Sequence, residues 1–178
     1  ISVLVVLAIG FIVRHLLYRN NEPYARYFMG GLLLKVLGAV AFCAIYRFYY
    51  GGGDTTVYFE HASFLYNQFF EQPARVWEVW RASAGTVTMQ TASITEKMPF
   101  YGNESTYMVI RIAAFIGLFT GNSFWVTSVF FAAISFTGAW AMYRVFVDWY
   151  PELYRPFAWA VFALPSVVFW GSGLLKDT

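Results

Sequence analysis

Three residues in the first half of the chain have the types and spacing of a general-base site. Asp54 follows three consecutive glycines, and Tyr58 and His61 come four and seven residues after it. These spacings place the three side chains on one face of a helix. A carboxylate beside an imidazole suits general-base chemistry, because each group adjusts the proton affinity of the other. We therefore take Asp54 as the candidate catalytic carboxylate and Tyr58 and His61 as candidate substrate-binding residues.

A simpler interpretation of Asp54 is that it only caps a helix. Aspartate is favoured at the N-cap, where its carboxylate accepts hydrogen bonds from the backbone N–H groups of the next turn. The glycines before it tolerate unusual backbone conformations and allow close approach of another group. The alternative is an exposed carboxylate at a lipid–water boundary, and the spacing alone does not decide between them.

A second cluster ends the sequence, and it reads Gly171-Ser172-Gly173-Leu174-Leu175-Lys176-Asp177. A break made of small residues, followed by a cation at a helix start, suits the binding of an anionic group such as a phosphate. Lys176 and Asp177 are therefore candidate substrate-binding residues. The alternative is a turn between helices whose lysine meets lipid head groups.

Arg111 is a third candidate for substrate binding, because it stands alone in the apolar segment 107–119. An ionised side chain in such a segment is costly and usually faces a partner or a watery cavity. It would then contact a phosphate or carboxylate. The alternative is that the side chain reaches the membrane interface from near the start of the segment.

The composition is that of an integral membrane protein. Of the 178 residues, 59% are hydrophobic and only 12% are charged, against roughly 25% charged in soluble domains. The net charge of +2 gives no case for nucleic-acid binding. The single cysteine, Cys43, excludes an intrachain disulfide and a paired-cysteine metal site. We expect an all-α integral membrane protein, with one transmembrane region that is a fragment of a longer chain.

The apolar runs predict a polytopic helical bundle. The expected spans cover residues 1–17, 28–49, 124–147 and 157–170, and segment 107–119 is either a short span or a re-entrant element. Lys35 lies within the second of these spans, where we expect it to reach the interface along its own methylene groups.

A long loop over 54–104 cannot span, and we expect interfacial amphipathic helices in it. Apolar residues at helical spacing predict one helix over 55–70, a second begins at Pro73, and the polar stretch 82–95 is expected to be a mobile loop.

Arginines predict the orientation of the chain. The connector with Arg14, Arg19 and Arg26 is expected to face the cytoplasm, which places Asp54 and the long loop on the non-cytoplasmic side. If segment 107–119 is re-entrant, the later arginines also face the cytoplasm and Lys176 returns to the side of Asp54. If that segment spans, the two residues lie on opposite sides.

The acidic residue in the first long non-cytoplasmic loop resembles the GT-C superfamily of polytopic membrane glycosyltransferases. The stretch 165–177 is similar to segments in bacterial membrane proteins of cell-surface polysaccharide assembly. The resemblance implies an enzyme of the bacterial inner (plasma) membrane that moves a sugar from a polyprenyl-phosphate carrier to an acceptor on the non-cytoplasmic side. It implies Asp54 as the catalytic base or as a carboxylate that orients the acceptor, and Lys176, alone or with Arg111, as a partner of the lipid phosphate. The superfamily often has two adjacent acidic residues in this loop, whereas Asp54 is followed by two threonines.

The alternative function is non-catalytic: a membrane subunit, or part of a transporter or flippase in a larger complex. The expected partners are membrane lipid, a polyprenyl-phosphate-linked sugar and protein subunits of a membrane complex, but no nucleic acid. No cofactor is implied, and a requirement for a divalent metal stays open.

Overall fold

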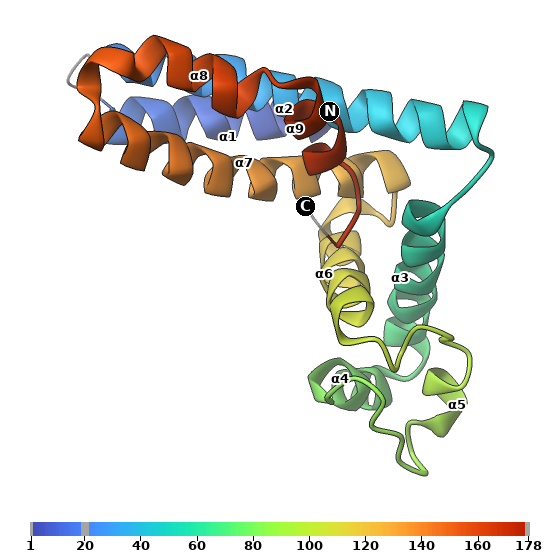
Figure 1. Ribbon diagram of the computed structural model, residues 1–178. Helices are drawn as coiled ribbons and strands as arrows, with labels where there is room; N and C mark the ends of the chain where they lie inside the picture. The colour runs from blue at the N-terminus through green and yellow to red at the C-terminus, as the bar shows by residue number, and fades with distance from the viewer. Residues whose placement is uncertain (1, 19–21, 177–178) are drawn as a thin grey trace.

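The computed structural model describes residues 2–18 and 22–176, and these ranges contain helices and turns but no strand. Figure 1 shows two parts, a bundle of long helices and an arm of helices that runs across the direction of the bundle. The bundle consists of α1 (Ser2–Leu17), α2 (Tyr27–Ala44), α7 (Phe124–Trp149) and α8 (Tyr154–Phe162), extended by the short turns η1 (Pro23–Arg26), η2 (Ile45–Tyr49) and η3 (Pro151–Leu153).

Two helices of the bundle are long and apolar enough to cross a membrane. One is the continuous helix Pro23–Tyr49, which joins η1, α2 and η2, and the other is α7. They have 27 and 26 residues, which at about 1.5 Å per residue exceeds the ~30 Å of a bilayer's hydrocarbon core. The helices expected over 28–49 and 124–147 are therefore present, and both begin or end a few residues beyond the expected bounds. The first expected helix is present as the shorter α1.

The expected span over 157–170 is broken in the middle. Helix α8 ends at Phe162, and α9 (Pro165–Phe169) with η4 (Trp170–Ser172) continues at a bend of 58°. Pro165 causes the break, because proline lacks the backbone N–H that would continue the helix and clashes with the preceding turn. The bent segment carries the end of the chain across the bundle toward the arm (Figure 1).

The arm comprises the helices α3 (Asp54–Glu71), α4 (Pro73–Arg81), α5 (Ala92–Thr95) and α6 (Glu104–Thr120). The stripe of α3 that contains Tyr58, Ala62 and Leu65 is buried against α6. Segment 107–119 therefore lies in the arm, paired with α3, and crosses the bundle direction instead of running along it (Figure 1).

The stretch 82–95 is more structured than the mobile loop that its composition predicts. It contains α5, whose Ile94 is fully buried, and Tyr101 donates a hydrogen bond of 2.7 Å to the carbonyl of Thr86. One apolar side chain and one phenol thus bind this polar stretch to the tip of the arm.

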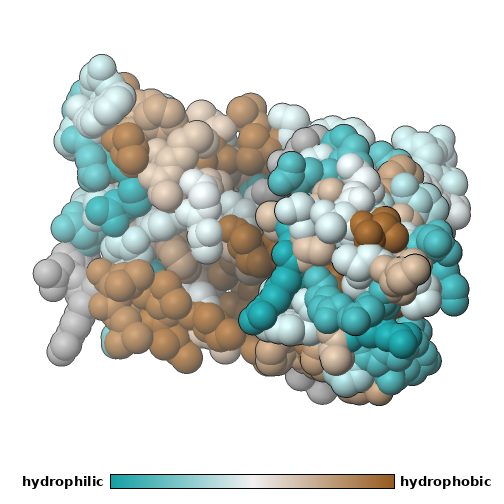
Figure 2. All heavy atoms as spheres, turned by 90° about the horizontal axis from the view of Figure 1, so that it is seen from below, coloured by the Kyte–Doolittle hydropathy of each residue, from teal (hydrophilic) through white to brown (hydrophobic). Residues whose placement is uncertain are grey.

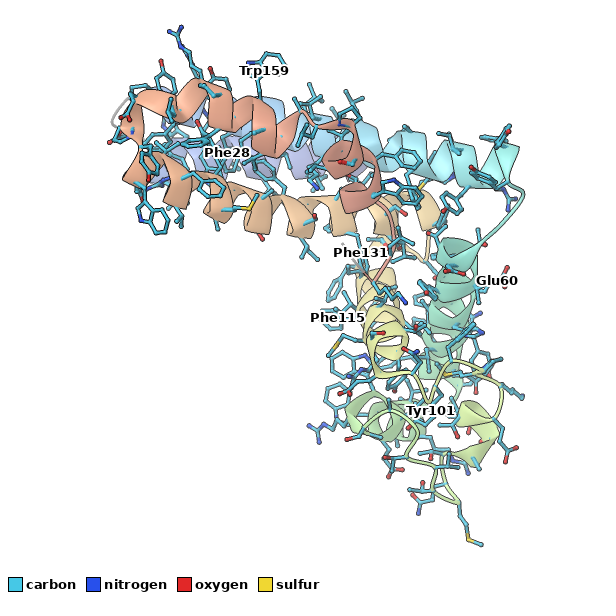
Figure 3. The ribbon with its side chains drawn as sticks, viewed as in Figure 1. Phe28, Glu60, Tyr101, Phe115, Phe131 and Trp159 are labelled. Atoms are coloured by element: carbon cyan, nitrogen blue, oxygen red, sulfur yellow. The ribbon has the colours of Figure 1, made fainter. Side chains whose placement is uncertain are left out.

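The bundle and the arm share a core where they meet. Phe131 of α7 points from the bundle into the top of the arm (Figure 3), and it belongs to the same apolar cluster as the α3 and α6 residues. Leu174, from the end of the chain, is fully buried in that cluster as well. The C-terminal segment is therefore packed at the junction of the two parts.

Candidate functional site at the junction of bundle and arm

Asp54 is the first residue of α3, directly after the turn that leaves the bundle. The turn consists of Gly51, Gly52 and Gly53, with φ values of 68°, 150° and 148°, which L-amino acids with side chains rarely adopt. A Cβ on Gly53 would also lie only 2.8 Å from the ring of Tyr46. Glycine is therefore required to bring the start of α3 this close to the end of the bundle.

Asp54 is not the N-cap that its sequence position predicts. The N-cap is Gly53, and its backbone N–H donates to Thr56 Oγ1 at 2.8 Å. Thr56 thus performs the capping that was expected of Asp54, because the glycine turn places the helix start one residue earlier. Asp54 is exposed, and its carboxylate has no hydrogen bond or ion pair within residues 2–18 and 22–176. The helix dipole favours a negative charge at this position.

The structure separates Asp54 from Tyr58 and His61 in environment, although the three lie along one helix. Tyr58 is 5% exposed and belongs to the core of the arm. His61 is half-buried against the ring of Phe100, at 5.8 Å between ring centroids. Burial lowers the pKa of His61, opposed by the nearby carboxylate of Glu60. No hydrogen bond joins the three predicted residues in the described part of the chain.

His61 also has a buried nitrogen without a partner. Its Nδ1 makes no hydrogen bond within the residues described by the structure. A neutral imidazole fits this environment better than an imidazolium, because an unpaired buried charge is costly.

The C-terminal segment places Lys176 at the same junction as Asp54. Leu174 is buried in the arm core, and Lys176 follows two residues later with an exposed side chain. Lys176 has no hydrogen bond or ion pair with the other described residues. Asp177, predicted beside it, lies outside the described residues.

One aromatic pair connects the two predicted motifs. Phe42 and Tyr46 are stacked at 4.4 Å between ring centroids. A Cβ on Gly173 would lie 2.5 Å from the ring of Phe42, just as one on Gly53 would meet Tyr46. The glycine turns that precede Lys176 and Asp54 therefore rest on neighbouring rings, which we call the aromatic junction (Phe42 and Tyr46).

Lys35 takes a position that the sequence did not predict. It does not reach the interface; it is 3% exposed, and its ammonium lies between α2, α7 and the bent segment. Its Nζ donates to Ser135 Oγ at 3.2 Å, to the carbonyl of Val167 at 3.1 Å and to that of Gly171 at 2.6 Å. All three ammonium protons thus have acceptors, as a buried lysine requires.

Lys35 therefore binds the bent segment to the bundle. The Gly171 carbonyl also accepts from Ser135 Oγ at 2.8 Å, so that two helices bind the same atom. The close approach of α9 to α2 depends on Gly38, because a Cβ at this position would overlap the carbonyl oxygen of Val168. A lysine with a glycine three residues later, on the same helix face, is the sequence signal that could have predicted this contact.

Arg111 lies in the arm and contacts α4, and no hydrogen bond or ion pair joins it to Asp54 within the described residues. Its Nη1 donates to the carbonyl of Trp80 at 2.9 Å, and Trp80 Nε1 donates to the carbonyl of Arg111 at 3.3 Å. This reciprocal pair joins α6 to α4, which follows the far end of α3. Arg111 also lies over the ring of Tyr107, at 4.7 Å from its centroid. The phosphate contact predicted for Arg111 is therefore not part of the junction.

The arginines of the connectors gather at the end of the bundle opposite the arm. Arg144 donates to the Tyr18 hydroxyl at 3.2 Å, and Arg155 donates to the Tyr154 hydroxyl at 3.0 Å. The contacts that involve the first connector are Arg14 to the Ala25 carbonyl and Arg26 to the Tyr154 hydroxyl. Arg19 lies outside the described residues. We call this end the basic end (Arg14, Arg26, Arg144 and Arg155).

The chemistry available at the junction is that of one free carboxylate and one free ammonium beside an aromatic surface. Within the described ranges, no group of three or more histidine, cysteine, aspartate or glutamate side chains is arranged to hold a metal ion. Comparisons with protein-family models, curated proteins and solved structures found no significant match.

Proposed function

We propose that this chain belongs to a membrane glycosyltransferase, which moves a sugar from a polyprenyl-phosphate carrier to an acceptor on the non-cytoplasmic side. The observation that carries the proposal is the placement of Asp54 and Lys176. Both side chains are exposed and unpaired within the described residues, and the turns that precede them pack on the aromatic junction. A transfer reaction with an anionic leaving group requires a base for the acceptor and a cation for the leaving group, and we assign these roles to Asp54 and Lys176.

The arginines of the two short connectors at one end of the bundle support this orientation. Cytoplasmic connectors carry an excess of lysine and arginine, and the basic end lies opposite the arm. Helix α6 runs across the bundle (Figure 1), so the chain does not cross back between Asp54 and the start of α7. In this arrangement Asp54 and Lys176 face the same, non-cytoplasmic side.

The reaction follows from the chemistry of the two groups. An acceptor hydroxyl attacks the anomeric carbon of the sugar and gives its proton to the Asp54 carboxylate. The bond between that carbon and the carrier phosphate oxygen breaks, and the electron pair leaves with the phosphate. The Lys176 ammonium stabilises this developing negative charge. Lys35 does not take part, because its three protons are bound by the bundle.

The non-catalytic alternative has one observation in its favour. Tyr58 and Arg111, two of the predicted site residues, are occupied by packing and by backbone hydrogen bonds. A membrane subunit that uses the arm only for assembly would retain those contacts and would not need Asp54.

Sugar transfer by an Asp54→Asn variant distinguishes the two functions. The matched control is Glu60→Gln, an exposed carboxylate on the same helix. In membranes containing the full-length protein, we expect Asp54→Asn to abolish transfer of radiolabelled sugar from the lipid carrier, with unchanged expression, while Glu60→Gln remains active. Lys176→Met should also reduce transfer, and Lys97→Met, at an exposed lysine of the arm, should not. Full activity of Asp54→Asn would refute the transferase.

A further inference from the structure

An apolar groove opens on the side of the arm, away from Asp54. Its volume is about 130 Å³, and it lies between α3, α4 and α6. The residues that line it are Leu65, Tyr66, Phe69, Val76, Trp77, Trp80, Ala114, Phe115 and Leu118. Its wall contains no charged side chain, so it favours a hydrocarbon occupant.

The groove continues into an exposed apolar stripe on α6. Met108, Ile112, Phe115 and Phe119 recur at spacings of four, three and four residues, and each is at least 37% exposed. In a protein surrounded only by water, a continuous exposed stripe of this kind would be unfavourable. It is typical of a helix that lies in a membrane interface with one face embedded.

The stripe faces the side on which a membrane would lie. Phe115 projects from the side of the arm along which the bundle extends, and Glu60 projects from the opposite side (Figure 3). Viewed from the tip of the arm, hydrophilic residues dominate the near surface, and hydrophobic patches lie on the bundle behind it (Figure 2). Because the bundle contains the helices that can span, we expect this side of the arm to face the hydrocarbon around them.

Two guanidinium groups contact the tryptophans that line the groove, although neither lines it directly. Trp77 and Trp80 stack at 5.3 Å between centroids, Arg81 lies 4.6 Å from the ring of Trp77, and Arg111 donates to the backbone carbonyl of Trp80. Neither arginine forms an ion pair within the described part of the chain. An anionic head group would supply the missing charge, while its hydrocarbon chain filled the groove.

We propose that this groove binds one acyl chain of an anionic phospholipid from the surrounding bilayer, with the head group at Arg81 and Arg111. The site fixes the depth and orientation of the arm, and therefore the height of the junction above the membrane. It does not depend on the transferase reaction, because the bound lipid is a component of the bilayer.

Photo-crosslinking tests the site. The full-length protein is reconstituted into phosphatidylcholine vesicles that contain phosphatidylglycerol with a diazirine in its acyl chain, or phosphatidylcholine with the same labelled chain. We expect phosphatidylglycerol to label peptides of α4 and α6 more strongly. Arg81→Gln should lower this labelling by up to about fivefold, because an interfacial charge contact contributes modest affinity. Arg75→Gln, on the same helix but outside the groove, should leave it unchanged.

Filling the groove with a large side chain provides a second test. Ala114→Trp should remove the labelling of α4 and α6, whereas Ala133→Trp, in the separate apolar cavity between α1, α2 and α7, should preserve it. Equal labelling by the two lipids, or labelling that is insensitive to Arg81→Gln, would overturn the proposal. Polyprenyl phosphate that displaces phosphatidylglycerol would also overturn it and would identify the groove as a carrier site. No sugar is present, so the result is independent of transferase activity.

Discussion

Replacing Ser135 by alanine tests whether the Lys35 ammonium is bound in the bundle as the distances indicate. Ser135 Oγ accepts from Lys35 Nζ and donates to the Gly171 carbonyl. The substitution leaves one ammonium proton without its acceptor, which should cost about 1.5–3 kcal/mol of unfolding free energy, the range for hydrogen bonds to charged groups. In a Lys35→Met background, only the bond to Gly171 is lost, at a cost of about 0.5–1.5 kcal/mol. The bond to Gly171 is lost in both backgrounds, so the coupling between the two positions should equal the cost of the lost ammonium bond, about 1.5–3 kcal/mol.

Lys35→Met alone should change the free energy of unfolding only slightly. That change leaves the Val167 carbonyl without a partner, which costs about 1–3 kcal/mol, but it also removes the desolvation penalty of a buried charge, several kcal/mol in the opposite direction. The four proteins of the cycle can be compared by reversible unfolding in mixed detergent micelles, followed by circular dichroism. An equal cost of Ser135→Ala in both backgrounds would refute the assigned role of Lys35.

Three further predictions concern stability and are measured in the same assay. Gly38→Ala should lower the free energy of unfolding by about 1–3 kcal/mol, because the added Cβ would overlap the Val168 carbonyl. Gly30 lies on the same helix with open space around it, so Gly30→Ala should be neutral or slightly stabilising. Thr56→Ala should cost about 1 kcal/mol, because it removes the side chain that closes the start of α3; a cost near zero would show that the glycine turn holds the helix start unaided. Burial lowers the pKa of His61 in the folded protein, so the unfolded chain binds a proton at this imidazole more readily, and the free energy of unfolding should fall as the pH drops below about 6.5. A His61→Asn variant should lose that part of the pH dependence. An unchanged slope of stability against pH would contradict the lowered pKa.

The helices of this chain could be predicted because their signals are local. The spacing of Tyr58, Ala62 and Leu65 predicted α3 and its buried face, and Pro73 marked the start of α4. Each signal depends only on residues within one or two helical turns. The exact start of α3 was missed, because Asp54 and Thr56 are both able to cap a helix and the sequence does not show which one the turn selects.

The roles of Lys35 and Arg111 could not be predicted in this way. Both were considered as flexible cations that reach the interface, yet both donate to backbone carbonyls of other helices. The acceptors of Lys35 include the Gly171 carbonyl, 136 residues away in the sequence. Every residue has a carbonyl, so side-chain types reveal nothing about which one will be near. Only the packing of α9 against the Gly38 face brings these atoms together.

The proposed transferase site requires Asp54 and Lys176 to face the same side of the membrane, opposite the basic end. Cysteine labelling measures this. The background is Cys43→Ala, which removes the single cysteine of this sequence. We introduce one cysteine at a time into it, as Asp54→Cys, Lys176→Cys or Arg155→Cys. Each variant is expressed in cells whose inner membrane is intact and can be reached by reagents added outside. A membrane-impermeant maleimide should label Asp54→Cys and Lys176→Cys without disruption of the membrane, and should label Arg155→Cys only after disruption. Labelling of Asp54→Cys and Lys176→Cys from opposite sides would contradict the proposed site.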